Sequence, residues 1–202
     1  NITTISSQTY TGAVTLDAAS AVGLIGAEFV FGNSLAGNSR NLTLTGGSAS
    51  FAGAVSGVGS GTGAGLTLTV SGAVVFSGTV AGTSGIVSTN ALGSTQFQQN
   101  VPLGDGDTGS SFAGSVNYDG LNWSSYDGLT LGNVTTLSSG TVSLNSNGGA
   151  IAFSNKVDGT QNLTLTAGIG SISFDASVGD TDPLSSLQIT SAVDVTFAGT
   201  VE

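Results

Sequence analysis

The sequence predicts an all-β protein built as a parallel β-helix, in which short strands from successive coils stack along one axis. Three observations support this prediction: an aromatic residue recurs about every 21 residues, alternating aliphatic residues precede it, and the composition is rich in glycine and β-branched residues. Nine or ten coils of about 21–25 residues would give a rod roughly 45 Å long.

The strongest pattern is an aromatic residue followed four positions later by an aliphatic one, as in FAGAV (51–55), FAGSV (112–116) and FAGTV (197–201). Successive aromatic residues lie 20 to 25 positions apart, except for one interval of 15 and one of 41, which is close to two ordinary steps. We expect these rings to stack as one core column, with one ring from each coil. The predicted column contains Tyr10, Phe31, Phe51, Phe76, Phe97, Phe112, Phe153, Phe174 and Phe197.

Alternating aliphatic residues predict the strands that precede each aromatic residue. Segments such as LTLT (66–69 and 163–166) place Leu on one face and Thr on the other, which is the period of a half-buried strand. The small residues after each aromatic residue predict a corner where the backbone bends without crowding the next coil. A β-sandwich also contains many short strands, but it needs no identical marker in each repeat. We therefore favour the solenoid, and expect its ends to be uncapped.

The composition excludes several classes of function. The chain has 202 residues, contains no cysteine and no histidine, and carries a formal net charge of −10, with Arg40 and Lys156 as its only basic side chains. Thiolate metal sites and histidine-based catalysis are therefore excluded. The negative charge disfavours binding to nucleic acid and to anionic lipid, and no apolar run is long enough to insert into a membrane. We expect no cofactor.

Residues 98–130 interrupt the pattern, so the predicted organisation is β-helix coils over 1–97, an irregular insertion or extra-helical hairpin over 98–130, and further coils over 131–202. The insertion holds the only tryptophan and two of the three tyrosines. Tyr118, Trp123 and Tyr126 could form an aromatic face that stacks on sugar rings, because loops on rigid scaffolds often carry binding sites. Alternatively, these rings could fill the insertion's own small core.

Two sets of aspartates in or near this segment suggest further sites. Asp105 and Asp107 have the D-x-D-x-G spacing of a calcium loop, but the later carboxylate that completes such a loop is missing, so a solvated acidic turn is the alternative. Asp119 and Asp127 could be the carboxylate pair of a polysaccharide-degrading enzyme. The basic residues lie far from both in sequence, and we expect no enzymatic activity.

SQTYTGAVTL (7–16), NLTLT (41–45 and 162–166) and the FAG-[AST]-V corners resemble segments of the giant β-helical repeat proteins of bacterial surfaces. This group includes filamentous haemagglutinin-like adhesins and autotransporter passengers. The resemblance implies a right-handed helix and an extracellular rod on a bacterial cell surface. The expected function is therefore a structural segment of a surface fibre, filament or sheath, whose partners are copies of itself or flanking repeats of the same long chain. The alternative is an adhesin stalk whose 98–130 insertion binds a surface glycan.

Overall fold

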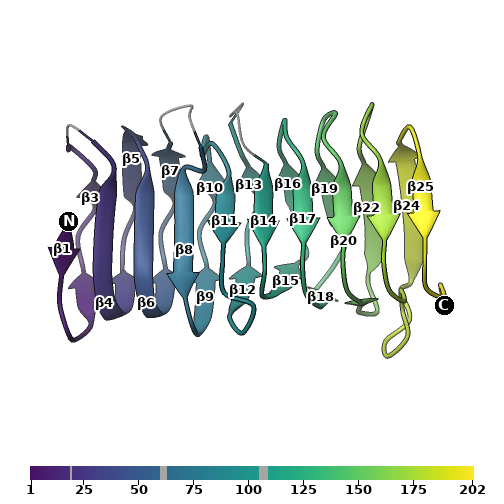
Figure 1. Cartoon of the computed structure of the whole chain (residues 1–202), viewed down its shortest axis with the longest axis horizontal. Coiled ribbons are helices and arrows are strands. Elements are labelled where there is room, and N and C mark those ends of the chain that lie inside the picture. The colour runs from purple at the N-terminus through teal and green to yellow at the C-terminus, as the bar shows by residue number, and fades with distance from the viewer. Residues whose placement is uncertain (19, 60–62, 105–108) are drawn as a thin grey trace.

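The chain folds as a parallel β-solenoid of about nine turns, which confirms the predicted fold class. The structure is a computed structural model that describes every residue except 19, 60–62 and 105–108. The residues described form 25 strands and no helix. Strands of successive turns lie side by side along the rod, and the two termini lie at its opposite ends (Figure 1).

Each turn passes over three faces, which we name front, lower and upper from their places in Figure 1. The front face contains β1 (Ile2–Thr3), β8 (Leu66–Val70), β11 (Ile86–Ser88), β14 (Ser110–Phe112), β17 (Leu129–Leu131), β20 (Ile151–Phe153), β23 (Ile172–Phe174) and β25 (Val195–Phe197). The lower face contains β2 (Gln8–Tyr10), β9 (Ala73–Phe76), β12 (Ser94–Phe97), β15 (Ser115–Asp119), β18 (Thr135–Ser138) and β21 (Val157–Asp158). The upper face contains β3 (Val14–Thr15), β5 (Leu35–Arg40), β7 (Val55–Val58), β10 (Val80–Ala81), β13 (Val101–Pro102), β16 (Asn122–Ser124), β19 (Val142–Asn145), β22 (Asn162–Thr166) and β24 (Ser186–Ser191).

Two long strands join the front and lower faces near the N-terminus. β4 (Val22–Phe31) and β6 (Leu42–Phe51) run across both faces without a break, and β6 pairs with β8 and with β9. From β8 onward the chain turns between the two faces, so each later turn has a front–lower corner. The upper face continues along the rod through two backbone hydrogen bonds, from Val80 N to Asn100 O (3.3 Å) and from Gly82 N to Pro102 O (3.0 Å).

The strands form where the predicted alternation buries one side of the chain. In β8, Leu66, Leu68 and Val70 are buried while Thr67 and Thr69 point outward, and β22 repeats this arrangement with Leu163 and Leu165. Because strands of parallel coils stack in register, each inward position becomes a continuous apolar column. The core of the rod is therefore a set of columns parallel to its axis.

The aromatic residues stack as expected, but in two columns instead of one. The lower column runs through Tyr10, Phe31, Phe51, Phe76, Phe97, Tyr118 and Leu137. Its neighbouring rings have centroids 4.6 to 5.8 Å apart. The front column runs through Leu24, Leu44, Leu68, Ser88, Phe112, Leu131, Phe153, Phe174 and Phe197. The prediction of a single column is therefore wrong.

The change of column explains both irregular intervals in the sequence. Phe97 pairs with Tyr118 on the lower face, whereas Phe112 lies one face earlier, on the front. The rings of Phe97 and Phe112 meet edge to face with centroids 5.7 Å apart. The interval of 15 is thus a step between faces, and the interval of 41 spans a turn in which Leu131 takes the aromatic position.

The recurring pentapeptide consequently turns two different corners. In 51–55 it joins the lower face to the upper one, whereas in 112–116 it joins the front face to the lower one. Each copy needs its glycine because the neighbouring coil lies against it. A Cβ atom on Gly53 would lie 2.6 Å from the carbonyl carbon of Asn33, and one on Gly114 would collide with the carbonyl oxygen of Gly93.

Residues 98–130 are a regular part of the solenoid wherever the structure describes them, and the prediction of an insertion or hairpin is wrong. β15 pairs with β12 and β18, and β16 pairs with β13 and β19. The sequence pattern breaks there because the aromatic marker changes face, while the ladders themselves continue. At the ends of the rod the core columns are partly exposed, at Ile2 (52%) and at Phe197 (44%).

Candidate functional site

The predicted aromatic binding face does not form. Tyr118 and Trp123 lie in the core with 0% and 1% of their surface exposed, and only Tyr126 reaches solvent. Trp123 takes the core position that Val101 holds in the preceding turn and packs edge to face against Phe97, Phe112 and Tyr118. Tyr118 and Trp123 therefore fill the core of the solenoid itself, and neither the binding face nor a separate core of an insertion includes all three rings.

Two polar atoms in this cluster are buried without a partner. The hydroxyl of Tyr118 and the indole Nε1 of Trp123 have no hydrogen-bond partner among the residues that the structure describes. Burial raises the pKa of Tyr118 far above that of a free tyrosine, because the phenolate has no solvent around it. Tyr118 therefore remains neutral in the folded protein at any ordinary pH.

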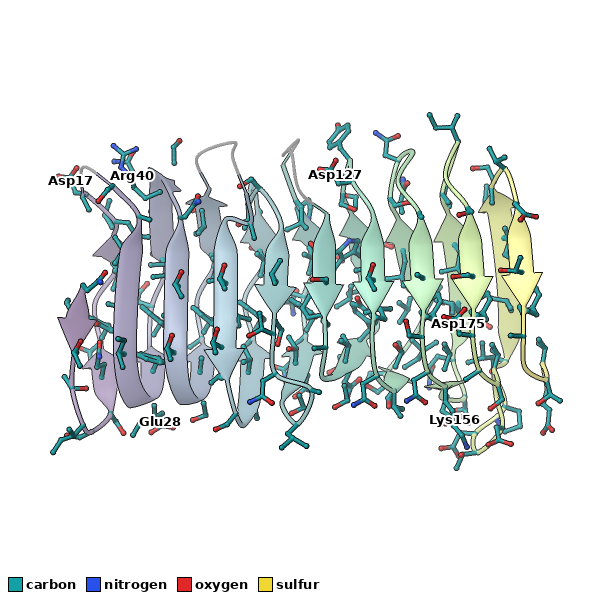
Figure 2. The ribbon with its side chains drawn as sticks, in the orientation of Figure 1. Asp17, Glu28, Arg40, Asp127, Lys156 and Asp175 are labelled. Atoms are coloured by element: carbon teal, nitrogen blue, oxygen red, sulfur yellow. The ribbon has the colours of Figure 1, made fainter. Side chains whose placement is uncertain are left out.

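The predicted carboxylate sites are separated or fall outside the described residues. Asp105 and Asp107 are among the residues that the structure does not describe. Asp119 ends β15 on the lower face, whereas Asp127 lies at the upper–front corner, where Figure 2 labels it. The Asp119 carboxylate lies 3.5 Å from Ser138 Oγ. Within the described parts of the chain, no group of three or more acidic side chains is placed to hold a metal ion.

One ion pair crosses the lower face near the C-terminal end. The Lys156 ammonium contacts the Asp180 carboxylate, and this contact raises the pKa of Lys156. Asp180 belongs to the long corner between Val178 and β24, whose backbone folds back on β21: Thr181 N donates to the Asp158 carboxylate (3.0 Å). This corner and the ion pair lie on the C-terminal part of the lower face, which continues beyond β21 through Val178 and Val201.

A second long corner borders the same face closer to the middle of the rod. Residues 89–93 join β11 to β12, and the amide of Asn133, two turns further on, donates to the carbonyl of Ala91 (3.2 Å). The corner therefore leans across the intervening turn, where Gly114 leaves room for it. Leu92 stands at its tip with 91% of its surface exposed.

Between these corners lies a shallow groove of about 230 Å³, which we call the lower-face groove. It crosses β12, β15 and β18 and is lined by Ser94, Thr95, Gln96, Ser115, Val116, Asn117 and Thr136. Sequence reasoning missed these residues, because they come from three separate turns. The unusual length of the 89–93 corner is the one local feature that could have indicated a groove.

Comparisons with known proteins add no relative: no family model, curated protein or solved structure matches the chain. No helix that could span a membrane occurs in the described part of the chain. The lower-face groove is therefore identified as a candidate site by its geometry alone.

Proposed function

We propose that this chain is a structural segment of a long extracellular β-solenoid that forms a bacterial surface fibre, filament or sheath. The single observation that carries the proposal is the unbroken stacking of about nine turns, with hydrogen-bonded ladders along the axis and apolar columns inside. Each turn is bonded to its two neighbours through these ladders, so the same contacts can be repeated along a longer rod.

The side chains support a structural role more than a catalytic one. Asp119 and Asp127, the carboxylate pair that the sequence suggests for glycoside chemistry, lie at different places around the rod. We therefore propose that the chain is not an enzyme. Incubation with a panel of polysaccharides tests this, and cleavage that is lost in Asp119→Asn would overturn it.

Immunogold electron microscopy of intact source cells tests the proposed function. An antibody raised against the chain should label thin fibres or a surface layer on unopened cells, and isolated fibres should diffract at an axial spacing of about 4.8 Å. Label found only after the cells are broken, or on short isolated particles, would contradict a fibre.

An adhesin remains the second candidate, but its site differs from the one that the sequence predicts. Tyr118 and Trp123 are inaccessible to a ligand, so a glycan would have to bind elsewhere. The lower-face groove is the observation that favours this role.

A further inference from the structure

The lower-face groove is bordered by parts of the rod that are held in place. The Asn133–Ala91 hydrogen bond fixes the middle of the 89–93 corner. Within the corner, the Asn90 side chain accepts a hydrogen bond from Leu92 N (2.9 Å), which fixes the turn. At the other end, the Lys156–Asp180 ion pair ties two turns together. The floor is a parallel sheet. A ligand would therefore meet a surface that is already formed, which lowers the entropy cost of binding.

Polar groups in the groove have unused hydrogen-bonding capacity. The Asn117 carbonyl oxygen accepts from Ser138 Oγ (2.9 Å), which orients the amide and leaves its NH₂ group without a partner among the described residues. Gln96 lies beside Asn117 in the ladder, and its amide makes no hydrogen bond to any described residue. Hydroxyls of Ser94, Ser115 and Thr136 complete the lining. These groups offer both donors and acceptors over three adjacent strands.

The charges nearby define which ligands fit. Two carboxylates lie next to the groove: Asp119 is on the same strand as Asn117, and Asp158 is the ladder neighbour of Thr136. The basic side chain on this face, Lys156, is paired with Asp180. The whole chain also carries a net charge of −10. An anionic ligand would be repelled, and a strongly apolar one would leave the amides and hydroxyls without partners. A neutral ligand with many hydroxyl groups satisfies both conditions.

We propose that the lower-face groove binds a neutral polysaccharide, which lies across β12, β15 and β18 and exchanges hydrogen bonds with Gln96 and Asn117. Leu92, exposed at the tip of the neighbouring corner, offers an apolar contact for the C–H face of a sugar ring. This proposal rests on the second candidate function, the adhesin, and names its site and ligand class. It does not depend on the structural function, because a fibre can form whether or not the groove is occupied.

Surface plasmon resonance with immobilised polysaccharides tests the proposal on the full chain. The probes are an α-glucan, a β-glucan, a mannan and a galactan, with a polyuronate as the anionic probe. We expect binding to at least one neutral polymer and none to the polyuronate. The double variant Gln96→Ala/Asn117→Ala should weaken that binding at least tenfold.

The upper face offers a matched control. Asn162 accepts a hydrogen bond from Ser186 Oγ (2.8 Å), as Asn117 does from Ser138, and Gln188 lies exposed on the neighbouring strand. Gln188→Ala/Asn162→Ala should therefore leave binding unchanged. Circular dichroism should show that both double variants are folded. The proposal is overturned if no neutral polymer binds, if the polyuronate binds equally well, or if the control variant loses as much affinity as the groove variant.

Discussion

The three tyrosines have different environments, so removing each hydroxyl should change stability in a different direction. Tyr118 is fully buried and its hydroxyl has no partner among the described residues, which costs about 1–3 kcal/mol relative to a satisfied or absent hydroxyl. Tyr118→Phe keeps the ring in a column that is otherwise mainly phenylalanine. We therefore expect the variant to be more stable than the parent by about 1–3 kcal/mol.

The other two tyrosines provide the comparison. The Tyr10 hydroxyl donates to Gln8 Oε1 (2.8 Å), so Tyr10→Phe should lose about 0.5–1.5 kcal/mol. Tyr126 is 54% exposed, and Tyr126→Phe should change the free energy of unfolding by less than about 0.5 kcal/mol.

Thermal unfolding followed by circular dichroism measures all three variants. For a chain of this length each kcal/mol shifts Tm by about 2–4 °C, so the variants should rank Tyr118→Phe, Tyr126→Phe and Tyr10→Phe from highest to lowest Tm. A lower Tm for Tyr118→Phe than for the parent would refute the reasoning, because it would mean that the buried hydroxyl makes a stabilising hydrogen bond.

Three further predictions concern pH, glycine and the aromatic columns. Because burial keeps Tyr118 neutral in the folded protein, its hydroxyl ionises above about pH 10 only in the unfolded chain. The free energy of unfolding should therefore fall by up to about 1.4 kcal/mol per pH unit above that pH, as measured by urea titrations. Tyr118→Phe should abolish this part of the slope. Gly170→Ala would place a methyl group against the carbonyl of Gly149 and should cost about 1–3 kcal/mol, whereas Gly12→Ala meets open space and should gain about 0.4–1 kcal/mol in the same assay. Phe153→Ala should cost about 3–5 kcal/mol, and Phe197→Ala clearly less because its ring is 44% exposed; equal losses would contradict the column model.

The period of the sequence was sufficient to predict the solenoid. An aromatic residue about every 21 positions, with alternating aliphatic residues before it, requires successive repeats to stack, because only stacking buries the same position of each repeat. The inward Leu and outward Thr of LTLT at 66–69 and 163–166 followed from the period-two geometry of a strand.

The period does not specify which corner of the coil carries the pentapeptide, and that was decided by the tertiary structure. A closed turn has three corners, and the same five residues fit the lower–upper corner at 51–55 and the front–lower corner at 112–116. From the sequence, the shift between them looked like an insertion, and Trp123 was open to two interpretations, a binding face or the small core of that insertion. In the fold, Trp123 fills the core beside the point where the aromatic column changes face.

The candidate site also depended on the tertiary structure. Gln96, Asn117 and Thr136 are each ordinary outward residues of separate strands, and nothing in their local sequence joins them. They become neighbours because parallel coils place residues about 21 positions apart on adjacent strands. The sequence by itself therefore determined the stacked, all-β architecture through its local periodicity. The tertiary structure decided which face carries the aromatic residue in each turn and which residues line the groove, because both depend on how turns with three corners stack on one another.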